Sequence, residues 1–101
     1  MEKTLESKIS VYRQFTEDGV IIKESIDENV IMVHRFPEGV TPATVQRVFS
    51  STVSTAPYEN MKITISITVP CYTEEISSAI NFAKNQSLPI LDEEVKKLKG
   101  L

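Results

Sequence analysis

The sequence predicts an α+β fold in which an antiparallel sheet of four or five strands carries one or two C-terminal helices on one face. Residues 61–69 alternate apolar and polar side chains, which is typical of a strand that is buried on one face. Beyond Thr73, apolar residues recur at helical spacing, so that segment has one apolar face. Because strand patterns come first and helical patterns last, we expect the helices to cross one face of the sheet.

The strand at 61–69 has the most regular pattern in the chain. The residues expected to face inward are Met61, Ile63, Ile65, Ile67 and Val69. The residues expected to face outward are Lys62, Thr64, Ser66 and Thr68. Pro70 has no N–H to donate, so the strand is expected to end there. The chain beyond Pro70 is expected to fold back and cover the inward side.

The N-terminal segment, residues 5–15, fits two structures. Leu5, Ile9 and Tyr12 recur at helical spacing, while Ile9 and Val11 have the polar neighbours of a strand. We favour a strand because a second β-rich run follows directly. Gly19 suits either the end of a helix or the left-handed position of a hairpin loop.

Residues 20–36 are predicted to form a hairpin. Apolar and β-branched residues fill 20–26 and 30–36, and the polar segment 27–29 between them has the composition of a turn. Proline and glycine at 37–42 then predict a loop.

A further strand is predicted over 45–53, followed by a turn at 54–57. One side of this strand would carry Val45, Phe49 and Val53. Arg47 falls on the same side, which indicates an edge strand or a bulge.

Two helices are predicted at the C-terminal end. Thr73 is placed as the N-cap of the first, followed by two glutamates at the positive end of the helix dipole. Its apolar face would be Ile76, Ala79, Ile80 and Ala83. Residues 85–87 interrupt the pattern, and a second helix is predicted from Ser87 and Pro89 to Gly100. Its apolar face would be Leu88, Leu91, Val95 and Leu98.

The composition is that of a small single domain spanning residues 1–101, with a net charge of −3 and a single cysteine. This charge provides no broad basic surface for duplex DNA. No apolar run approaches the roughly 20 residues that span a bilayer, and the N-terminus lacks the apolar segment of a signal peptide. One cysteine excludes an intramolecular disulfide and fits a reducing cytosol. We therefore expect a cytoplasmic protein that does not associate with membranes.

The residues that could carry chemistry do not form a catalytic or metal-binding pattern. Cys71 precedes a helix start, yet Glu74 and Glu75 oppose a lowered thiol pKa, so a buried or half-buried structural cysteine is favoured. His34 is the only histidine, which argues against zinc ligation and favours a strand histidine that is either hydrogen-bonded or at the surface. The acidic clusters fall at turns and helix starts, and there is no calcium or phosphate-binding loop. The sequence therefore predicts no catalytic residues, metal or cofactor.

A binding surface is the favoured site. The outward residues of 61–69 form a Ser/Thr-rich face, and Ser50, Thr52 and Ser54 are expected to lie opposite them. Such a face has few charged side chains, so little prevents another protein from packing against it. The alternative is a platform for single-stranded nucleic acid. It would use the aromatic residues Tyr12, Phe36, Phe49, Tyr58 and Tyr72 with the basic residues Arg13, Arg35, Arg47 and Lys62. The candidate binding residues are Arg35, Arg47, Tyr58, Lys62, Thr64, Ser66 and Thr68.

Three motifs resemble a family of small, uncharacterised phage, prophage and metagenomic proteins. They are Thr41-Pro42-Ala43-Thr44-Val45, Tyr58-Glu59 and Val69-Pro70-Cys71-Tyr72-Thr73-Glu74-Glu75-Ile76. The resemblance covers about half of the chain, residues 36–83. It implies an accessory protein of a mobile element in a bacterial or archaeal cytoplasm.

These observations lead us to expect a non-enzymatic binding protein of phage or mobile-element type. It would act through a sheet surface or edge on a host protein or nucleoprotein, for example as an inhibitor of a defence system, and the edge could also pair with a second copy of the chain. The alternative function is a single-stranded nucleic-acid-binding accessory protein of phage replication. A small enzyme or ligand-sequestering protein that uses Cys71 or His34 is a more distant hypothesis.

Overall fold

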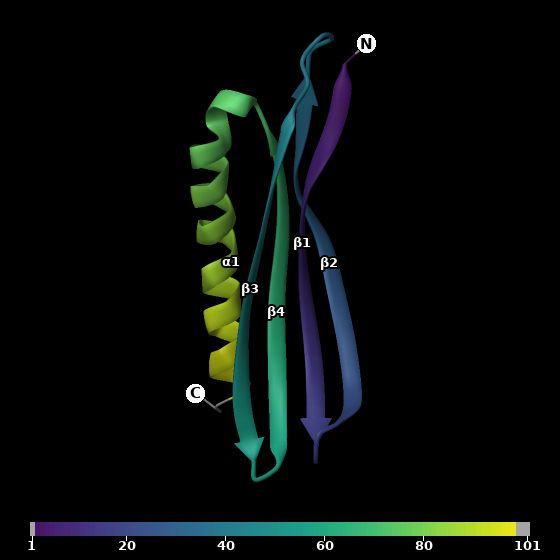
Figure 1. The fold of residues 1–101 in the computed structure, drawn as a ribbon, viewed down its shortest axis with the longest axis vertical. Coiled ribbons are helices and arrows are strands. Elements are labelled where there is room, and N and C mark those ends of the chain that lie inside the picture. The colour runs from purple at the N-terminus through teal and green to yellow at the C-terminus, as the bar shows by residue number, and fades with distance from the viewer. Residues whose placement is uncertain (1, 99–101) are drawn as a thin grey trace.

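The computed structural model describes residues 2–98 and contains four strands and one α-helix (Figure 1). The elements are β1 (Lys3–Glu17), β2 (Val20–Phe36), β3 (Ala43–Ala56), β4 (Glu59–Cys71), a 3-10 turn (Thr73–Glu75) and α1 (Ile76–Leu98). The strands form one antiparallel sheet in the order β2-β1-β4-β3. The predicted α+β class, with an antiparallel sheet and a C-terminal helix on one face, is confirmed.

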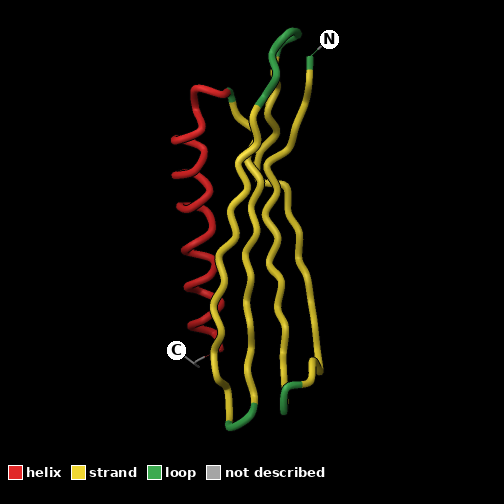
Figure 2. The backbone as a smooth tube through the Cα atoms, in the orientation of Figure 1, coloured by secondary structure: helices red, strands yellow, loops and turns green. Residues whose placement is uncertain are grey.

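The molecule is elongated, with extents of 55 × 22 × 17 Å. Figures 1 and 2 show the helix running alongside the long strands, and it packs mainly on β3 and β4. We call the side of the sheet that carries α1 the helix face, and the opposite side the open face. Within the described residues, no helix is long and apolar enough to span a membrane.

The inward side of β4 forms the centre of the core, as predicted. Ile63, Ile65 and Ile67 have no exposed surface, and Val69 is 3% exposed. Burying one such side chain contributes roughly 1.5–3 kcal/mol before the loss of chain entropy is subtracted. The surrounding core residues are Ile9, Val11, Val45, Cys71, Ala79 and Ala83. The prediction that the chain after Pro70 covers this side is confirmed.

Small residues bring the helix close to the sheet. Ala79, Ala83 and Ser87 are the buried residues of α1, and their spacing of four places them on one face of the helix. The Ser87 hydroxyl is fully buried and has no hydrogen-bond partner among the described residues. A serine therefore fits at position 87 because its side chain is small, and its hydroxyl contributes no hydrogen bond there.

The predicted break between two helices is wrong, because α1 runs without interruption through Pro89. A proline inside a helix removes one backbone hydrogen bond and costs roughly 3 kcal/mol. Apolar residues on both sides of Pro89 pack against the same core, which offsets this cost. The predicted helix end at Gly100 lies outside the described residues.

The start of the helix also differs from the prediction. Tyr72, not Thr73, is the N-cap residue, and no side chain makes a capping hydrogen bond. The chain enters α1 through a 3-10 turn in which the Glu75 N–H donates to the Tyr72 carbonyl at 2.9 Å. The two glutamates do lie in this first turn, as expected.

Residues 20–36 form one strand and not the predicted hairpin. The polar segment 27–29 stays extended because β1 supplies partners for it, and Arg13 binds Asp27 at 2.7 Å. The actual hairpin joins β1 to β2 at Asp18 and Gly19, which both have positive φ (52° and 78°). The strand favoured for residues 5–15 is confirmed, as is the left-handed glycine.

Pro70 lies inside β4, so the prediction that it ends the strand is wrong. β1 pairs with β4 only as far as Thr68, whereas β3 continues to pair with β4 through Pro70 and Cys71. Pro70 therefore lies where β4 has a neighbour on one side only, which is where a sheet tolerates proline.

β3 is an edge strand, as Arg47 indicated. Arg47 lies on the helix face with Val45, Phe49 and Val53, opposite the inward residues of β4. The loop predicted before this strand is confirmed. The turn predicted at 54–57 is displaced, because β3 continues to Ala56 and the chain turns at Pro57 and Tyr58.

Candidate functional site

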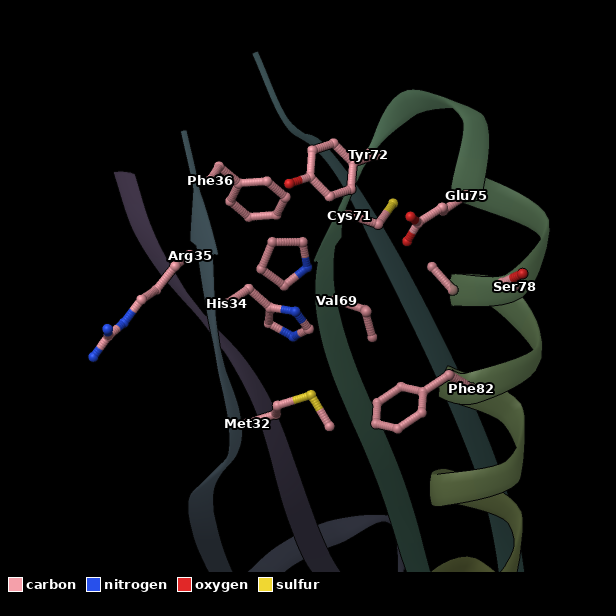
Figure 3. Close-up of a pocket in the computed structure, with 12 residues that line it drawn as sticks. Met32, His34, Arg35, Phe36, Val69, Cys71, Tyr72, Glu75, Ser78 and Phe82 are labelled. Carbon is pink, nitrogen blue, oxygen red and sulfur yellow. The ribbon is translucent and has the colours of Figure 1, made fainter. Parts of the chain in front are cut away.

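A pocket of about 250 Å³ lies between the C-terminal end of β2, the end of β4 and the first turns of α1. Residues 3–7 of β1 pair only with β2, so this part of the β1–β2 hairpin separates from β4. An extra residue in β2 at Ile31 shifts the register at this point. Figure 3 shows the Met32, His34 and Phe36 side chains pointing into the pocket, while Arg35 points away from it.

His34 is held in place at the pocket wall. Its Nε2 lies 2.6 Å from the Ser7 hydroxyl oxygen, and Ser7 is fully buried. The His34 ring stacks on Phe36 at 6.4 Å between ring centres, and Phe36 meets the Tyr72 ring edge-on at 5.1 Å. Of the two settings predicted for this strand histidine, hydrogen-bonded or at the surface, the structure shows the hydrogen-bonded one.

Cys71 lines the same pocket but is only 6% exposed. Burial raises the pKa of its thiol above the ordinary value, and the nearby carboxylate of Glu75 raises it further. A thiol in this setting stays protonated and is a poor nucleophile. The predicted structural role of Cys71 agrees with this geometry. The sequence did not indicate that Cys71 and His34 line one pocket, since they lie in different elements.

Four of the predicted binding residues lie together on the open face. Lys62, Thr64, Ser66 and Thr68 alternate along β4, facing away from the inward isoleucines. Their partners on β3 are the expected ones, with Thr64 opposite Ser50 and Lys62 opposite Thr52. The predicted Ser/Thr-rich face is therefore a real and continuous surface across β3 and β4.

The other three predicted binding residues lie elsewhere. Arg47 lies on the helix face, where its guanidinium is 5.4 Å from the centre of the Phe49 ring. Tyr58 is 81% exposed in the β3–β4 turn. Arg35 lies near the C-terminal end of β2 and pairs with Thr4. The structure does not bring these residues together with the β4 group.

The aromatic residues proposed for a nucleic-acid platform are also dispersed. Phe36 is 2% exposed and packs against Tyr72 in the pocket. Phe49 lies on the helix face, Tyr58 lies in a turn, and Tyr12 lies on the open face beside Thr64. Bases stack on successive rings of one surface, and the described residues offer no such row.

The feature that sequence reasoning missed is the outer edge of β2. β2 is an outermost strand of the sheet, and seven of its large apolar side chains are exposed by 46–65%. They are Val20, Ile21, Ile22, Ile26, Val30, Met32 and Val33. The signal was present as a long run of β-branched residues, but the predicted turn at 27–29 divided it in two.

Charged residues surround this edge. Arg13 on the helix face binds both Asp27 of β2 and Glu94 of α1. These bonds raise the pKa of Arg13 and lower the pKa of Glu94. On the open face, Lys8 lies 3.8 Å from Glu28. Two carboxylates around one guanidinium leave the Arg13 cluster with an excess negative charge.

Comparison with models of protein families, with curated proteins and with solved structures finds no match to this chain. Among residues 2–98, no three His, Cys, Asp or Glu side chains lie close enough to hold a metal ion. The case for a function therefore depends on the surfaces described above.

Proposed function

We propose that this chain is a non-enzymatic binding protein that acts on another protein through the β2 edge and the adjoining open face. The observation that carries the proposal is the set of exposed apolar side chains on β2, led by Ile26 at 65% and Val20 at 60% exposure. A long apolar edge strand is normally protected by charge, proline or a covering element. Apart from Arg35, charged residues occupy only the middle of β2, at 23–28, and the apolar residues on either side of them leave an edge that can receive a strand or surface of a partner.

The open face supports the same proposal. On the same side of the sheet, Lys62, Thr64, Ser66 and Thr68 provide hydroxyl groups and one positive charge on β4, which β1 separates from β2. Short polar side chains adapt to a partner's hydrogen-bonding groups and lose little rotamer freedom when they are ordered. The resemblance to small phage and prophage proteins gives the proposed setting: a mobile-element protein that occupies a surface of a host protein.

Affinity capture from a lysate of the cells that carry the gene tests this proposal. The test variants are Ile26→Lys and Val30→Lys, which place a charge on exposed positions of β2 and should leave the fold intact. The matched control is Leu88→Lys, since Leu88 is 37% exposed on α1, on the other side of the sheet from the open face. We expect both β2 variants to lose proteins that the unmodified chain and the control retain. Equal capture by all four proteins would contradict the proposal.

A further inference from the structure

The outer edge of β2 contains one straight segment between two irregularities. Two register shifts in the β1–β2 ladder leave Ile22 and Ile31 without direct partners on β1. Between them, Lys23–Val30 pairs residue for residue with β1. A straight segment presents evenly spaced N–H and C=O groups on its free side, which is the geometry that accepts another strand.

We propose that the Lys23–Asp27 part of this segment pairs with Lys23–Asp27 of a second copy of the chain, antiparallel, with Ser25 opposite Ser25. The product is a dimer with a continuous eight-stranded sheet. This inference rests on the proposed function and names one occupant of the β2 edge. The open faces of the two copies then form one surface available to a host protein.

Symmetry limits the registers that such a dimer can use. Two identical strands that pair edge to edge and antiparallel are related by a two-fold axis perpendicular to the sheet. Directly opposed side chains lie on the same face, and faces alternate along a strand. The axis must therefore pass through a residue and not between two residues. The axis can pass through any of four residues and still leave at least two residues of the straight segment on each side. These residues are Ser25, Ile26, Asp27 and Glu28.

Electrostatics excludes three of these centres. An axis at Asp27 or Glu28 places that carboxylate opposite its own copy. An axis at Ile26 places Glu24 opposite Glu28 on both sides of the centre. Like charges directly opposite one another destabilise a strand pair, so none of these registers suits this segment.

An axis at Ser25 instead brings opposite charges together. It places Lys23 opposite the second copy's Asp27, and does so twice because of the symmetry. Lys23 is exposed and has no ion-pair partner among the described residues. Asp27 already binds Arg13, which also binds Glu94, so the second Lys23 supplies the positive charge that this cluster lacks.

The same register removes apolar surface from water. Five of the exposed apolar side chains of β2 lie within five residues of Ser25, and each is at least 51% exposed in the single chain. They are Val20, Ile21, Ile22, Ile26 and Val30. Burial of apolar side chains is the main driving force of association; Ile26 lies within the paired segment, and the other four flank it.

Cysteine cross-linking tests the register. Ser25→Cys places two thiols at directly opposed positions, within the span that a disulfide can bridge. Glu28→Cys is the matched control, because Glu28 is equally placed on the exposed strand but lies opposite Ile22 in this register. After mild oxidation, we expect a covalent dimer with Ser25→Cys and monomer with Glu28→Cys. Buried Cys71 stays in place in both variants and in the unmodified control. Equal cross-linking of both variants, or of neither, would overturn the register.

Sedimentation across a wide range of protein concentration tests the dimer itself. Lys23→Glu replaces both Lys23–Asp27 attractions by repulsion and should weaken dimerisation about tenfold. Lys84→Glu, the same change at an exposed lysine on α1, should have little effect. A monomer at every concentration would overturn the dimer. If Ile26→Lys still abolished partner capture by that monomer, the proposed function would stand without it.

Discussion

Arg13 in β1 binds Glu94 in α1 through a two-point contact, with Nε to Oε2 at 3.0 Å and Nη2 to Oε1 at 2.6 Å. The two residues are 81 positions apart, and the contact fixes the C-terminal half of the helix to the sheet. The pairing lowers the pKa of Glu94 below its ordinary value of 4.5, chiefly through the Arg13 hydrogen bond. Charge-assisted, two-point contacts of this kind are among the stronger polar interactions in proteins.

Glu94→Gln tests this contact through its pH dependence. The carboxylate stabilises the folded state fully above pH 4.5, and the effect is lost as the pH falls through the lowered folded-state pKa. We expect the variant to lose about 1 kcal/mol of unfolding free energy at pH 7 and little at pH 2. Thermal melts of both proteins across this pH range make the measurement. A constant difference at all pH values would show that the charge is not the cause.

Ser87→Ala is expected to stabilise the protein. The Ser87 hydroxyl is fully buried and has no partner among the described residues, and such a group typically costs about 1–3 kcal/mol. Alanine also has the higher helix propensity. Ser77→Ala, at an exposed position of the same helix, isolates the propensity effect. We expect a gain of about 1 kcal/mol beyond this control in urea denaturation, and a smaller gain would indicate that the hydroxyl is satisfied.

Ile65→Lys is expected to unfold the domain. Ile65 is fully buried at the centre of the sheet and lies opposite Val11 and Phe49. A lysine there would bury an unpaired charge and leave the core incompletely packed. Ser50→Lys is the control, because Ser50 is exposed on the open face of β3. Circular dichroism should show no cooperative melt for Ile65→Lys and a native one for Ser50→Lys. A native melt of Ile65→Lys would refute the position of β4 in the core.

Pro89→Ala tests the continuity of α1. If one helix runs from Ile76 to Leu98, alanine restores a missing backbone hydrogen bond and should raise the unfolding free energy by about 1–3 kcal/mol. If Pro89 instead began a second helix, a backbone N–H at position 89 would need no helical partner, and alanine would give no gain. Urea denaturation distinguishes the two results.

The parts of the fold that were predictable are those with local causes. The alternation in β4 determines which side of that strand is buried, and the apolar spacing after Thr73 determines which face of α1 meets it. The segment 27–29 could not be predicted in the same way. Its polar residues are typical of a turn, and only the partner Arg13, on another strand, explains why they stay extended.

The same distinction between local and long-range causes applies to the candidate site. Lys62, Thr64, Ser66 and Thr68 follow one another in a single strand, so their common face could be read from the sequence. The pocket combines His34 with Cys71, which are brought together only by the separation of the β1–β2 hairpin from β4. No pattern within either segment carries that information.

The central claim is that the outer edge of β2 is unpaired in the single chain and is the surface through which the chain binds. Amide hydrogen exchange along Lys23–Val30, in dilute and in concentrated protein, tests it most directly. We predict that the outward amides of this segment exchange rapidly in dilute solution and become protected at high concentration, while the β4 amides stay protected throughout. Fast exchange at every concentration that also persists in the presence of the captured partner would contradict the claim.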